Sequence, residues 1–301
     1  MTKNLPKVSI ITINFNGTAV TADLLRSLEK ITYPSIEVIV VDNSNKELGH
    51  QLPIDFPWIK YIETGENLGF AGGNNRGIKA ATGEYLFLLN NDTEVDPGFL
   101  EPLIARFETD PKIGVVCPKI LYFDEPDTIQ FAGFSPINPI TGRGFSIGYL
   151  EKDKGQHDKA MPTSRAHGAA MLFSRKAFDK VGFMAVLFFL YYEEMDYCER
   201  FVRAGYSIWY EPASRIWHKE SISTGKGSTL KTYYYSRNRL LYLRRNTFGP
   251  QRILMYLYYF SIAVPKNLLG YITKGDWEHL KAFWKGLIWN FSNTSKDIYD
   301  K

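Results

Sequence analysis

The chain has 301 residues, of which 45% are hydrophobic and 23% are charged. This composition excludes global disorder and allows one large globular domain, or one domain with an appendage. The net charge of +4 is unevenly spread, because residues 221–275 hold nine basic residues and no Asp or Glu. The remainder therefore carries a net charge of −5, and a basic segment is joined to a mildly acidic one.

Other features bear on the cellular setting. Cys117 and Cys198 lack metal or redox spacing, which favours a reducing compartment and no disulfide. Met1 leads directly into a strand pattern without a charged and then apolar leader, which predicts that the protein is not secreted. No window reaches the roughly 20 apolar residues of a membrane-spanning helix.

Strand and helix patterns alternate along the first 120 residues. The predicted strands cover residues 8–13, 36–41, 58–64, 85–89 and 114–118. The predicted helices cover residues 21–30 and 99–107, and residues 69–81 are predicted to form a glycine-rich turn that runs into a helix. This alternation predicts an α/β fold with a mostly parallel, doubly wound sheet flanked by helices.

The second half of the chain is less regular. Residues 124–164 are rich in Gly, Pro and Asp, and we expect loops and short antiparallel strands that form a mobile flap. Further strands are predicted at 169–173 and 207–210, and helices at 175–181 and within 188–204. Beyond Lys231 the sequence is helical, aromatic and basic. We therefore predict an α/β domain over residues 1–225 and a C-terminal helical region over 226–301.

Polar clusters follow three of the predicted strands. They are Asn14-Phe15-Asn16, Asp42-Asn43 and Asn90-Asn91-Asp92. In doubly wound sheets, ligands bind outside the carboxyl ends of the strands. The sequence therefore predicts a binding site at this edge of the sheet.

Asp92 ends the third of these clusters. A carboxylate at a strand end is a hard oxygen ligand for Mg²⁺ or Mn²⁺. Such a cation would neutralise the charge that develops on a departing diphosphate. The alternative is an Asx turn that caps the strand, and the residues alone leave both open.

A glycine-rich stretch covers residues 63–78 and places Asn74-Asn75 before a helix. Glycines allow the backbone to approach a ligand closely, and a helix N-terminus favours anions. The stretch matches neither the P-loop nor the dinucleotide fingerprint. An ordinary turn remains the alternative.

Three carboxylates, Glu193, Glu194 and Asp196, lie within four positions at a predicted helix start. Mutual repulsion raises the pKa of such groups, which makes one of them a candidate general base. Acidic residues also favour the first helical turn, and i,i+4 pairs are available at Asp196–Arg200 and Glu199–Arg203. We assign the chemistry to Glu194 and a structural role to Asp196.

His218 follows Trp217 on a predicted loop near this acidic cluster. A lone histidine is either a ligand or a structural residue, and both interpretations stay open at this point.

Together these motifs resemble the family 2 inverting glycosyltransferases of the GT-A fold. Within that family they are similar to the bacterial rhamnosyltransferase-like branch, which builds cell-surface polysaccharides. The resemblance runs from about Val8 to Arg245. It rests on Val40-Val41-Asp42-Asn43-Ser44, on residues 67–77 and 88–92, on Gly168-Ala169-Ala170, on residues 191–196 and on His218.

The resemblance implies roles for individual residues. Glu194 would be the catalytic base, and Asp92 would bind Mg²⁺ or Mn²⁺ with His218 as a second ligand. Asp42 would accept the nucleobase imide N–H. The other residues implied in nucleotide-sugar binding are Thr12 and Asn14 at the base, Asn67 and Asn75 at the nucleoside, Asn91 at the ribose or diphosphate, and Gly168 and Ala169 beside the sugar or acceptor.

The segment around Arg237 resembles the aromatic-then-Arg-Asn segment of the family. A guanidinium there suits a diphosphate, so Arg237 is a further candidate for nucleotide-sugar binding. The metal motif departs from the family, because Asn-Asn-Asp supplies fewer charges than an acidic pair. His218 is correspondingly more important to the expected metal site.

The implied reaction is an inverting transfer from a UDP- or dTDP-sugar to a lipid-linked or polysaccharide acceptor. One base suffices, because the leaving group is already anionic and needs no acid. A nucleotidyltransferase is one alternative, although Asn14-Phe15-Asn16-Gly17 lacks the basic signature expected of it. A catalytically inactive, membrane-peripheral binding module is the other, and an intact Glu194 speaks against it.

The C-terminal region suggests a location. Residues 253–264 are apolar and aromatic, too short to span a bilayer but suited to an interfacial helix beside basic residues. Trp277, Trp284 and Trp289 suit a headgroup boundary. We therefore expect a cytoplasmic protein, peripheral on the inner membrane face. A packed helical layer or an oligomer contact is the alternative, and no nucleic-acid motif is present.

Overall fold

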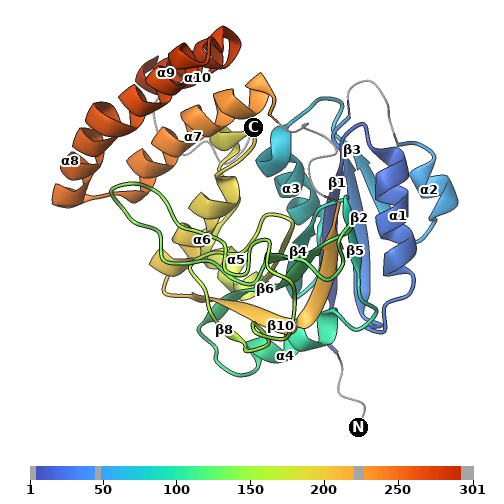
Figure 1. Cartoon of the computed structure of the whole chain (residues 1–301). Coiled ribbons are helices and arrows are strands. Elements are labelled where there is room, and N and C mark those ends of the chain that lie inside the picture. Colours follow the sequence, from blue (N-terminus) through green and yellow to red (C-terminus); the bar gives the residue numbers. More distant parts are fainter. Residues whose placement is uncertain (1–4, 45–48, 220–226, 293–301) are drawn as a thin grey trace.

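The computed structural model describes residues 5–44, 49–219 and 227–292. The domain boundary expected between residues 225 and 226 lies outside these ranges. A single ten-stranded sheet forms the centre, in the order β3-β2-β1-β4-β9-β6-β10-β5, with β7 paired to β6 and β8 to β10 (Figure 1). The expected α/β sheet with a C-terminal helical extension is confirmed.

The N-terminal half of the sheet is parallel. Its strands are β1 (Val8–Asn14), β2 (Ile36–Asp42), β3 (Lys60–Glu63) and β4 (Tyr85–Leu89). Their connections include the helices α1 (Thr18–Leu28), α2 (Leu52–Asp55) and α3 (Gly69–Ala80). Asn14 is in register with Asp42, so the carboxyl ends of β1 and β2 meet at one edge of the sheet, as the strand-end clusters predict.

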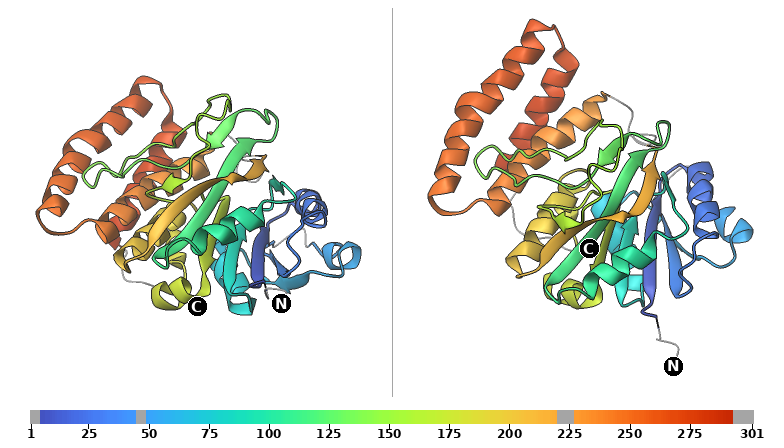
Figure 2. Two further views of the ribbon diagram at one scale, coloured as in Figure 1. Left: turned by 90° about the horizontal axis from the view of Figure 1, so that it is seen from below. Right: turned by 60° about the horizontal axis from the view of Figure 1, so that its bottom comes forward.

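The other half of the sheet is mixed. Its strands are β5 (Thr93–Val95), β6 (Ile113–Tyr122), β7 (Ile129–Phe131), β8 (Met161–Pro162), β9 (Ala170–Ser174) and β10 (Ser207–His218). β9 runs antiparallel to both β4 and β6, whereas β10 is parallel to β6. Helices α4 (Leu100–Phe107) and α6 (Glu193–Arg203) cover opposite sides of β6 and β10 (Figure 2).

Two predicted elements differ from the structure. The strand predicted at residues 207–210 continues to His218 as β10, where a register shift between Glu211 and Arg215 accommodates Pro212. His218 is therefore the last residue of a strand and does not lie on a loop. The expected glycine-rich turn is already helical from Gly69. Its glycines allow α3 to pack closely on the sheet, since a Cβ on Gly77 would lie 2.2 Å from Ile11 Cγ2.

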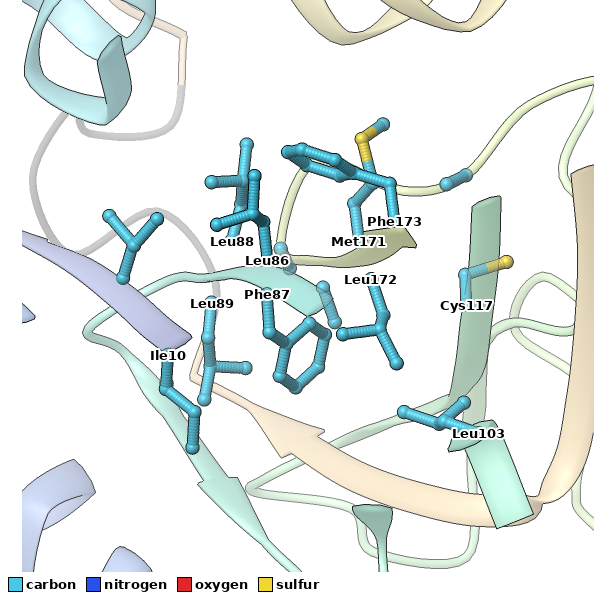
Figure 3. Packing of buried hydrophobic residues seen from close by; sticks show 14 of the residues in the cluster. Ile10, Leu86, Phe87, Leu88, Leu89, Leu103, Cys117, Met171, Leu172 and Phe173 are labelled. Carbon is cyan, nitrogen blue, oxygen red and sulfur yellow. The ribbon is translucent and has the colours of Figure 1, made fainter. Parts of the chain in front are cut away.

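The main core lies on both faces of this sheet. Figure 3 shows Phe87 of β4 on one side of the strand and Leu86 and Leu88 on the other. Phe87 lies on the side of Leu103 from α4 and Leu172 from β9. All five side chains are buried, which fixes the register of the central strands.

The irregular segment between residues 124 and 164 contains the short strands β7 and β8, as predicted. It is tied to the sheet by Lys119, whose fully buried ammonium group pairs with Asp153 at 2.8 Å and with Asp158. Mobility of this segment stays a prediction.

A layer of helices lies beside the sheet and has its own core (Figures 1 and 2). Its elements are α7 (Thr229–Asn246), α8 (Gly249–Tyr258), the π-helical turn η2 (Tyr259–Ala263), α9 (Val264–Thr273) and α10 (Trp277–Ser292). α10 packs directly on α7, where a Cβ on Gly286 would lie 2.2 Å from Ser236 Oγ. The layer also buries Phe188 and Met195 beside the start of α6, which joins it to the sheet domain.

Cys117 of β6 and Cys198 of α6 are both free and buried. Burial raises the pKa of both thiols, so neither is a reactive thiolate at neutral pH.

Candidate active site

Asp42 ends β2 and organises the backbone after it. Its carboxylate accepts hydrogen bonds from the amides of Ser44 (3.0 Å) and Gly49 (2.5 Å) and from the Tyr61 hydroxyl. Burial alone would raise the pKa of Asp42, but these hydrogen bonds outweigh burial and lower it. The sheet edge thus carries a fixed, charged acceptor where the nucleobase was expected.

A hydrogen-bond chain joins the ends of β1 and β4. The Thr21 hydroxyl donates to Asn14 Oδ1 at 2.9 Å, and Asn91 Nδ2 donates to the Thr21 hydroxyl at 2.9 Å. Thr12 Oγ1 and Asn14 Nδ2 are buried without a hydrogen-bond partner. Both residues are fully buried near the carboxyl end of β1, and their part in binding a nucleobase stays a prediction.

Asn67 and Asn75 have different positions. Asn67 Oδ1 accepts from the amide of Gly69 (2.9 Å) and from Asn43 Nδ2 (3.1 Å), so it fixes the first turn of α3 beside Asp42. Asn75 is buried, and its amide pairs with the N–H (3.0 Å) and the carbonyl (2.9 Å) of Met184. Asn75 therefore fastens the backbone at residue 184 to α3, and its role at a nucleoside stays a prediction.

Asp92 and His218 are brought together by strand pairing. β5 and β10 are antiparallel with Thr93 opposite His218, which places His218 Nε2 3.1 Å from Asp92 Oδ1. On the other side of the ring, Nδ1 lies 2.8 Å from Gln130 Oε1, which accepts a hydrogen bond from the tautomer that carries its proton on Nδ1. In that tautomer, the lone pair of Nε2 faces Asp92 Oδ1, a buried carboxylate oxygen.

These two residues fit a divalent cation. One carboxylate oxygen and one imidazole nitrogen face each other, and Gln130 orients the ring as an outer partner of a metal ligand does. No group of three or more His, Cys, Asp or Glu side chains suited to a metal occurs within the described ranges. The pair thus supplies two ligands, and diphosphate oxygens and water are the donors suited to the rest.

Glu194 lies in the first turn of α6. Its Oε1 is 3.3 Å from Arg165 Nη1, and a Cβ on Gly168 would lie 3.6 Å from Glu194 Cγ. The neighbouring Ala169 is buried, and its carbonyl accepts the amide of Asn90 at 2.9 Å. Residues 168 and 169 therefore run between Glu194 and the end of β4.

Glu193 and Asp196 flank the candidate base. Burial, followed by the charge of Glu194, raises the pKa of Glu193 well above its ordinary value. Asp196 is buried and pairs with Arg245 of α7 through two bonds of 2.8 and 3.1 Å. The structural role predicted for Asp196 fits this contact, but its partner is Arg245, 49 residues away, and the predicted i,i+4 partner Arg200 instead donates to backbone carbonyls.

The loop before α6 has unusual backbone geometry. Phe189, Tyr191 and Tyr192 all have positive φ, between 63° and 74°. Such conformations cost about 1–3 kcal/mol each for residues other than glycine and persist only where neighbours hold them. Asn238 of α7 does so, donating through Nδ2 to the carbonyls of Phe188, Leu190 and Tyr191 at 2.7–2.9 Å.

Arg237 completes this clamp. It is buried, and its guanidinium donates to the carbonyls of Leu187 (2.8 Å) and Phe188 (2.5 Å) and to Asn238 Oδ1 (2.8 Å). It also stacks on Trp289 of α10, with its Cζ 4.4 Å from the ring centre. These donors of Arg237 hold the loop that carries the acidic cluster, and its role at the diphosphate stays a prediction.

Several site residues were not singled out in the sequence. Gln130 lies in the irregular segment, and Arg165 and His167 lie on the loop that leads to β9. The partly buried His167 ring packs edge-on against His218 at 5.9 Å, and desolvation, followed by the charges of His218 and Arg165, lowers its pKa to about 3. The sequence gives one signal for Arg165 and His167, because they lie directly before Gly168 and Ala169, which were predicted to lie beside the sugar or acceptor.

The fold is that of the GT-A glycosyltransferases. GalNAc-T7, solved with UDP, GalNAc and Mn²⁺, superposes with a TM-score of 0.62 at 16% identity over 87% of this chain. The chain spans 57% of that structure. A second similar structure is the mannosyltransferase PcManGT from Pyrobaculum calidifontis, solved with GDP-Man and Mn²⁺. It superposes with a TM-score of 0.56 at 16% identity, covering 97% of this chain and 77% of that one. Both share the fold.

Sequence comparison gives the family. The model described as "Glycosyl transferase family 2" matches residues 9–182, more than half of the chain, so the protein belongs to glycosyltransferase family 2. A similar protein is the low-salt glycan biosynthesis hexosyltransferase Agl10 of Haloferax volcanii, 29% identical over 79% of this chain and 75% of that protein. Another is the N-acetylglucosaminyl-diphospho-decaprenol L-rhamnosyltransferase of Mycobacterium tuberculosis, 25% identical over 67% and 72%. Membership of this family excludes the nucleotidyltransferase alternative.

Proposed function

We propose that the protein is an inverting, metal-dependent glycosyltransferase. It would transfer a sugar from a UDP- or dTDP-sugar to a lipid-linked or polysaccharide acceptor in cell-surface glycan synthesis. The observation that carries this proposal is the short span between the metal-ligand pair and the candidate base. His167 packs on His218, and the next residue, Gly168, abuts Glu194.

Each part of this arrangement has a task. Asp42, Thr12, Asn14, Asn67 and Asn91 line the sheet edge and suit the nucleoside. A divalent cation held by Asp92 and His218 would neutralise the charge on the diphosphate. Glu194 accepts the proton of an acceptor hydroxyl, whose oxygen attacks the anomeric carbon from the side opposite the diphosphate. A single displacement needs no protein nucleophile and inverts that carbon.

A cavity near this base is the candidate acceptor site. This cavity of about 260 Å³ is lined by Tyr192, two residues before Glu194, and by side chains of the helical layer that include Tyr235 and Tyr259. Lys231 and Arg239 add two cations to the same wall. Aromatic rings suit the face of a sugar and the cations suit a diphosphate, and the Mycobacterium relative is named for an acceptor that combines the two. A lipid-linked acceptor sugar is therefore the occupant we propose.

Calorimetry with UDP and dTDP, with and without Mn²⁺ or Mg²⁺, tests the donor and metal assignments. We expect nucleotide affinity to rise with metal in the wild-type chain, and this increase to disappear in Asp92→Ala and His218→Ala. Glu94→Gln is the matched control, because this neighbouring carboxylate pairs with Lys219 at 2.9 Å and not with His218. Equal affinity with and without metal in all of these proteins contradicts the metal site.

Activity separates an enzyme from an inactive binding module. Release of UDP or dTDP from a panel of nucleotide sugars, measured with and without candidate acceptors, identifies the donor. We expect turnover with at least one donor, stimulated by a lipid-linked acceptor. Nucleotide-sugar binding without any turnover across the panel favours the inactive module.

We further propose that the protein binds the inner membrane face peripherally. Within the described ranges, no helix is long and apolar enough to cross a bilayer. The inner face of the helical layer is packed, which fits the packing alternative, but its outer face is apolar. The exposed side chains on α8 to α10 include Ile253, Leu254, Leu257, Phe260, Ile262, Leu269, Ile272, Trp277, Trp284, Ile288 and Phe291.

Vesicle flotation tests this location. Exposed cations of the helical layer, such as Lys266 and Lys274, favour an anionic leaflet, with roughly 1 kcal/mol for each cation near the surface, screened by salt. We expect binding to need anionic lipid, to weaken with salt, and to fall in Leu254→Ser/Leu257→Ser but not in the control Ile54→Ser on α2. If the full-length chain does not bind anionic vesicles at low salt, membrane association is contradicted. The apolar outer face is then better explained as an oligomer contact.

A further inference from the structure

The candidate base needs support at its backbone and at its side chain. The clamp from α7 supports the backbone, because it contacts main-chain carbonyls in the loop directly before α6. It leaves the carboxylate of Glu194 to other neighbours. A carboxylate that accepts one particular proton must also point in a fixed direction, because a displacement of about 1 Å can slow a reaction about 100-fold.

Arg165 contacts this carboxylate. Its Nη1 lies 3.3 Å from Glu194 Oε1, and the two side chains are only 16% and 18% exposed. Among the described residues this is the one ion pair that Glu194 makes. The contact uses Oε1 and leaves Oε2 for the hydroxyl of an acceptor. It is also longer than the roughly 2.7–2.9 Å of a tight charge-assisted bond, so it can orient the carboxylate without preventing it from taking a proton.

The guanidinium of Arg165 is itself held in place. It lies over the buried ring of Phe134, with its Cζ 3.6 Å from the ring centre. Thr163 Oγ1 joins the two residues, because it accepts the amide of Phe134 at 2.7 Å and donates to the carbonyl of Arg165 at 3.2 Å. A planar cation stacked on a fixed ring directs its donors toward a defined place.

The stretch from Arg165 to Gly168 runs along the face of α6 that carries Glu194. The amide of Ala166 donates at 3.3 Å to the Sγ of Cys198, one helical turn beyond Glu194. Gly168 lies against the side chain of Glu194, where an added Cβ would be 3.6 Å from Cγ. This stretch therefore meets α6 at three points, and Arg165 provides the charged one.

We propose that Arg165 is a positioning residue, which orients the carboxylate of Glu194 toward the acceptor hydroxyl and acts through Glu194 alone. The proposal rests on the proposed function, in which Glu194 is the base. It extends the active site to Phe134 in the irregular segment, because the ring of Phe134 holds the guanidinium. The competing role for Arg165 is direct contact with an anionic group of the acceptor.

Kinetics of four full-length proteins separate these two roles: the wild type, Arg165→Ala, Glu194→Gln and the double variant. Turnover is the release of UDP or dTDP with the donor and acceptor that the panel above identifies. We expect kcat of Arg165→Ala to fall at least ~10-fold, with the acceptor KM and the metal-dependent nucleotide affinity unchanged. The double variant should be as slow as Glu194→Gln, because a residue that acts through the base adds nothing once the base is removed.

Chemical rescue separates positioning from a general loss of structure. Guanidinium ion at non-denaturing concentration should raise kcat of Arg165→Ala, and Arg165→Lys should keep more activity than Arg165→Ala. Arg106→Ala is the matched control, because Arg106 on α4 also pairs with a glutamate, Glu211 at 2.6 Å, and also lies over an aromatic ring, that of Trp209. Arg106→Ala should lose stability, keep its kcat and gain nothing from guanidinium.

Two kinetic results overturn the proposal. The first is an unchanged kcat in a folded Arg165→Ala variant. The second is a double variant slower than Glu194→Gln together with a raised acceptor KM in Arg165→Ala, which shows direct contact with the acceptor. An equal fall of kcat in Arg165→Ala and Arg106→Ala also overturns it, because the effect is then one of stability.

Chemical denaturation of the same four proteins tests the contact without turnover. Arg165→Ala should cost less stability in the Glu194→Gln background than in the wild type, because the ion pair is already broken there. Equal costs in both backgrounds overturn the contact on which the proposal depends. This measurement decides the matter even if no donor in the panel is turned over, a result that contradicts the proposed function.

Failure of this proposal can thus be told apart from failure of the proposed function. Full turnover in Glu194→Gln contradicts the assignment of the base. A slow Glu194→Gln beside a fully active Arg165→Ala contradicts the role of Arg165 alone.

Discussion

The sheet edge and the loop before α6 are built differently. At the sheet edge, Asp42 and Asn67 bind backbone amides within a few residues of themselves. The loop at residues 187–192 is instead held by Arg237 and Asn238, nearly 50 residues later in the chain. The edge is set by strand register, whereas the loop depends on the packing of a separate helical layer.

This difference assigns different tasks to the two regions. A sheet edge with local hydrogen bonds is a stable platform for the nucleotide part of a donor. The loop places Glu194 through three residues with positive φ and a distant clamp, so its geometry depends on α7. Variants at the edge should change binding, and variants at the loop should change turnover and stability.

The largest effect is expected at Glu194. Glu194→Gln preserves the shape of the side chain but cannot accept a proton, so turnover should fall by at least ~10²-fold while donor affinity stays. The measurement is donor turnover beside nucleotide calorimetry. Glu199→Gln on the same helix should keep activity, because its contact with the Tyr242 hydroxyl survives. If turnover is lost in a folded Asp196→Asn variant but kept in Glu194→Gln, the assignment of the base to Glu194 is wrong.

Asp196→Asn should mainly reduce stability. It removes the buried carboxylate charge that pairs with Arg245, and breaking a buried pair from one side costs about 3 kcal/mol or more. The free energy of unfolding, measured by chemical denaturation, checks this. Asp127→Asn is the matched control, because Asp127 pairs with Lys152 at an exposed site and should change stability little. An equal loss of stability in Asp196→Asn and Asp127→Asn contradicts the structural role of the buried pair.

Two asparagines test the contrast between the regions directly. Asn238→Ala removes three buried hydrogen bonds to loop carbonyls, and we expect about 1–3 kcal/mol lower stability together with a lower kcat. Asn67→Ala removes local bonds at the edge and should mainly weaken nucleotide binding. Steady-state kinetics separates kcat from KM for both. Equal changes in kcat would show that α7 does not position the base.

The smallest effect concerns pH. The pKa of Glu193 is raised in the folded state. Above the ordinary pKa of glutamate, the folded protein therefore keeps a proton on Glu193 that the unfolded chain has released. The free energy of unfolding therefore falls as pH rises above that value, by up to about 1.4 kcal/mol per pH unit. Glu193→Gln should flatten this dependence in denaturation at several pH values, and the exposed Glu29→Gln should not. If the free energy of unfolding of Glu193→Gln changes with pH as steeply as that of the wild type, another group causes the pH dependence.

The sequence predicts the regular part of the molecule well. The alternation that ends in Asn14, Asp42 and Asp92 indicates the sheet and its site edge, because strand ends and turn residues are local features. The extension of β10 to His218 could not be predicted, since Pro212 is typical of a turn and only the pairing with β6 and β5 keeps the strand intact.

The second region could not be predicted for a different reason. Arg237 and Asn75 are polar residues in motifs that resemble a family pattern, so a ligand was their natural partner. In the structure, each binds backbone of residues 184–188, from α7 and from α3 respectively. Contacts of this kind depend on how two distant segments pack, which no local pattern records.

The two buried cysteines have a practical consequence for measuring where this chain sits on a bilayer. With Cys117 and Cys198 shielded and only weakly ionised, a single cysteine introduced at an exposed position would be the only thiol to take up a nitroxide or a fluorophore. Labels at Leu257 and Trp284 on the helical layer, and at Ile54 on the far side of the sheet, would give three separate reports of immersion depth from an otherwise native molecule.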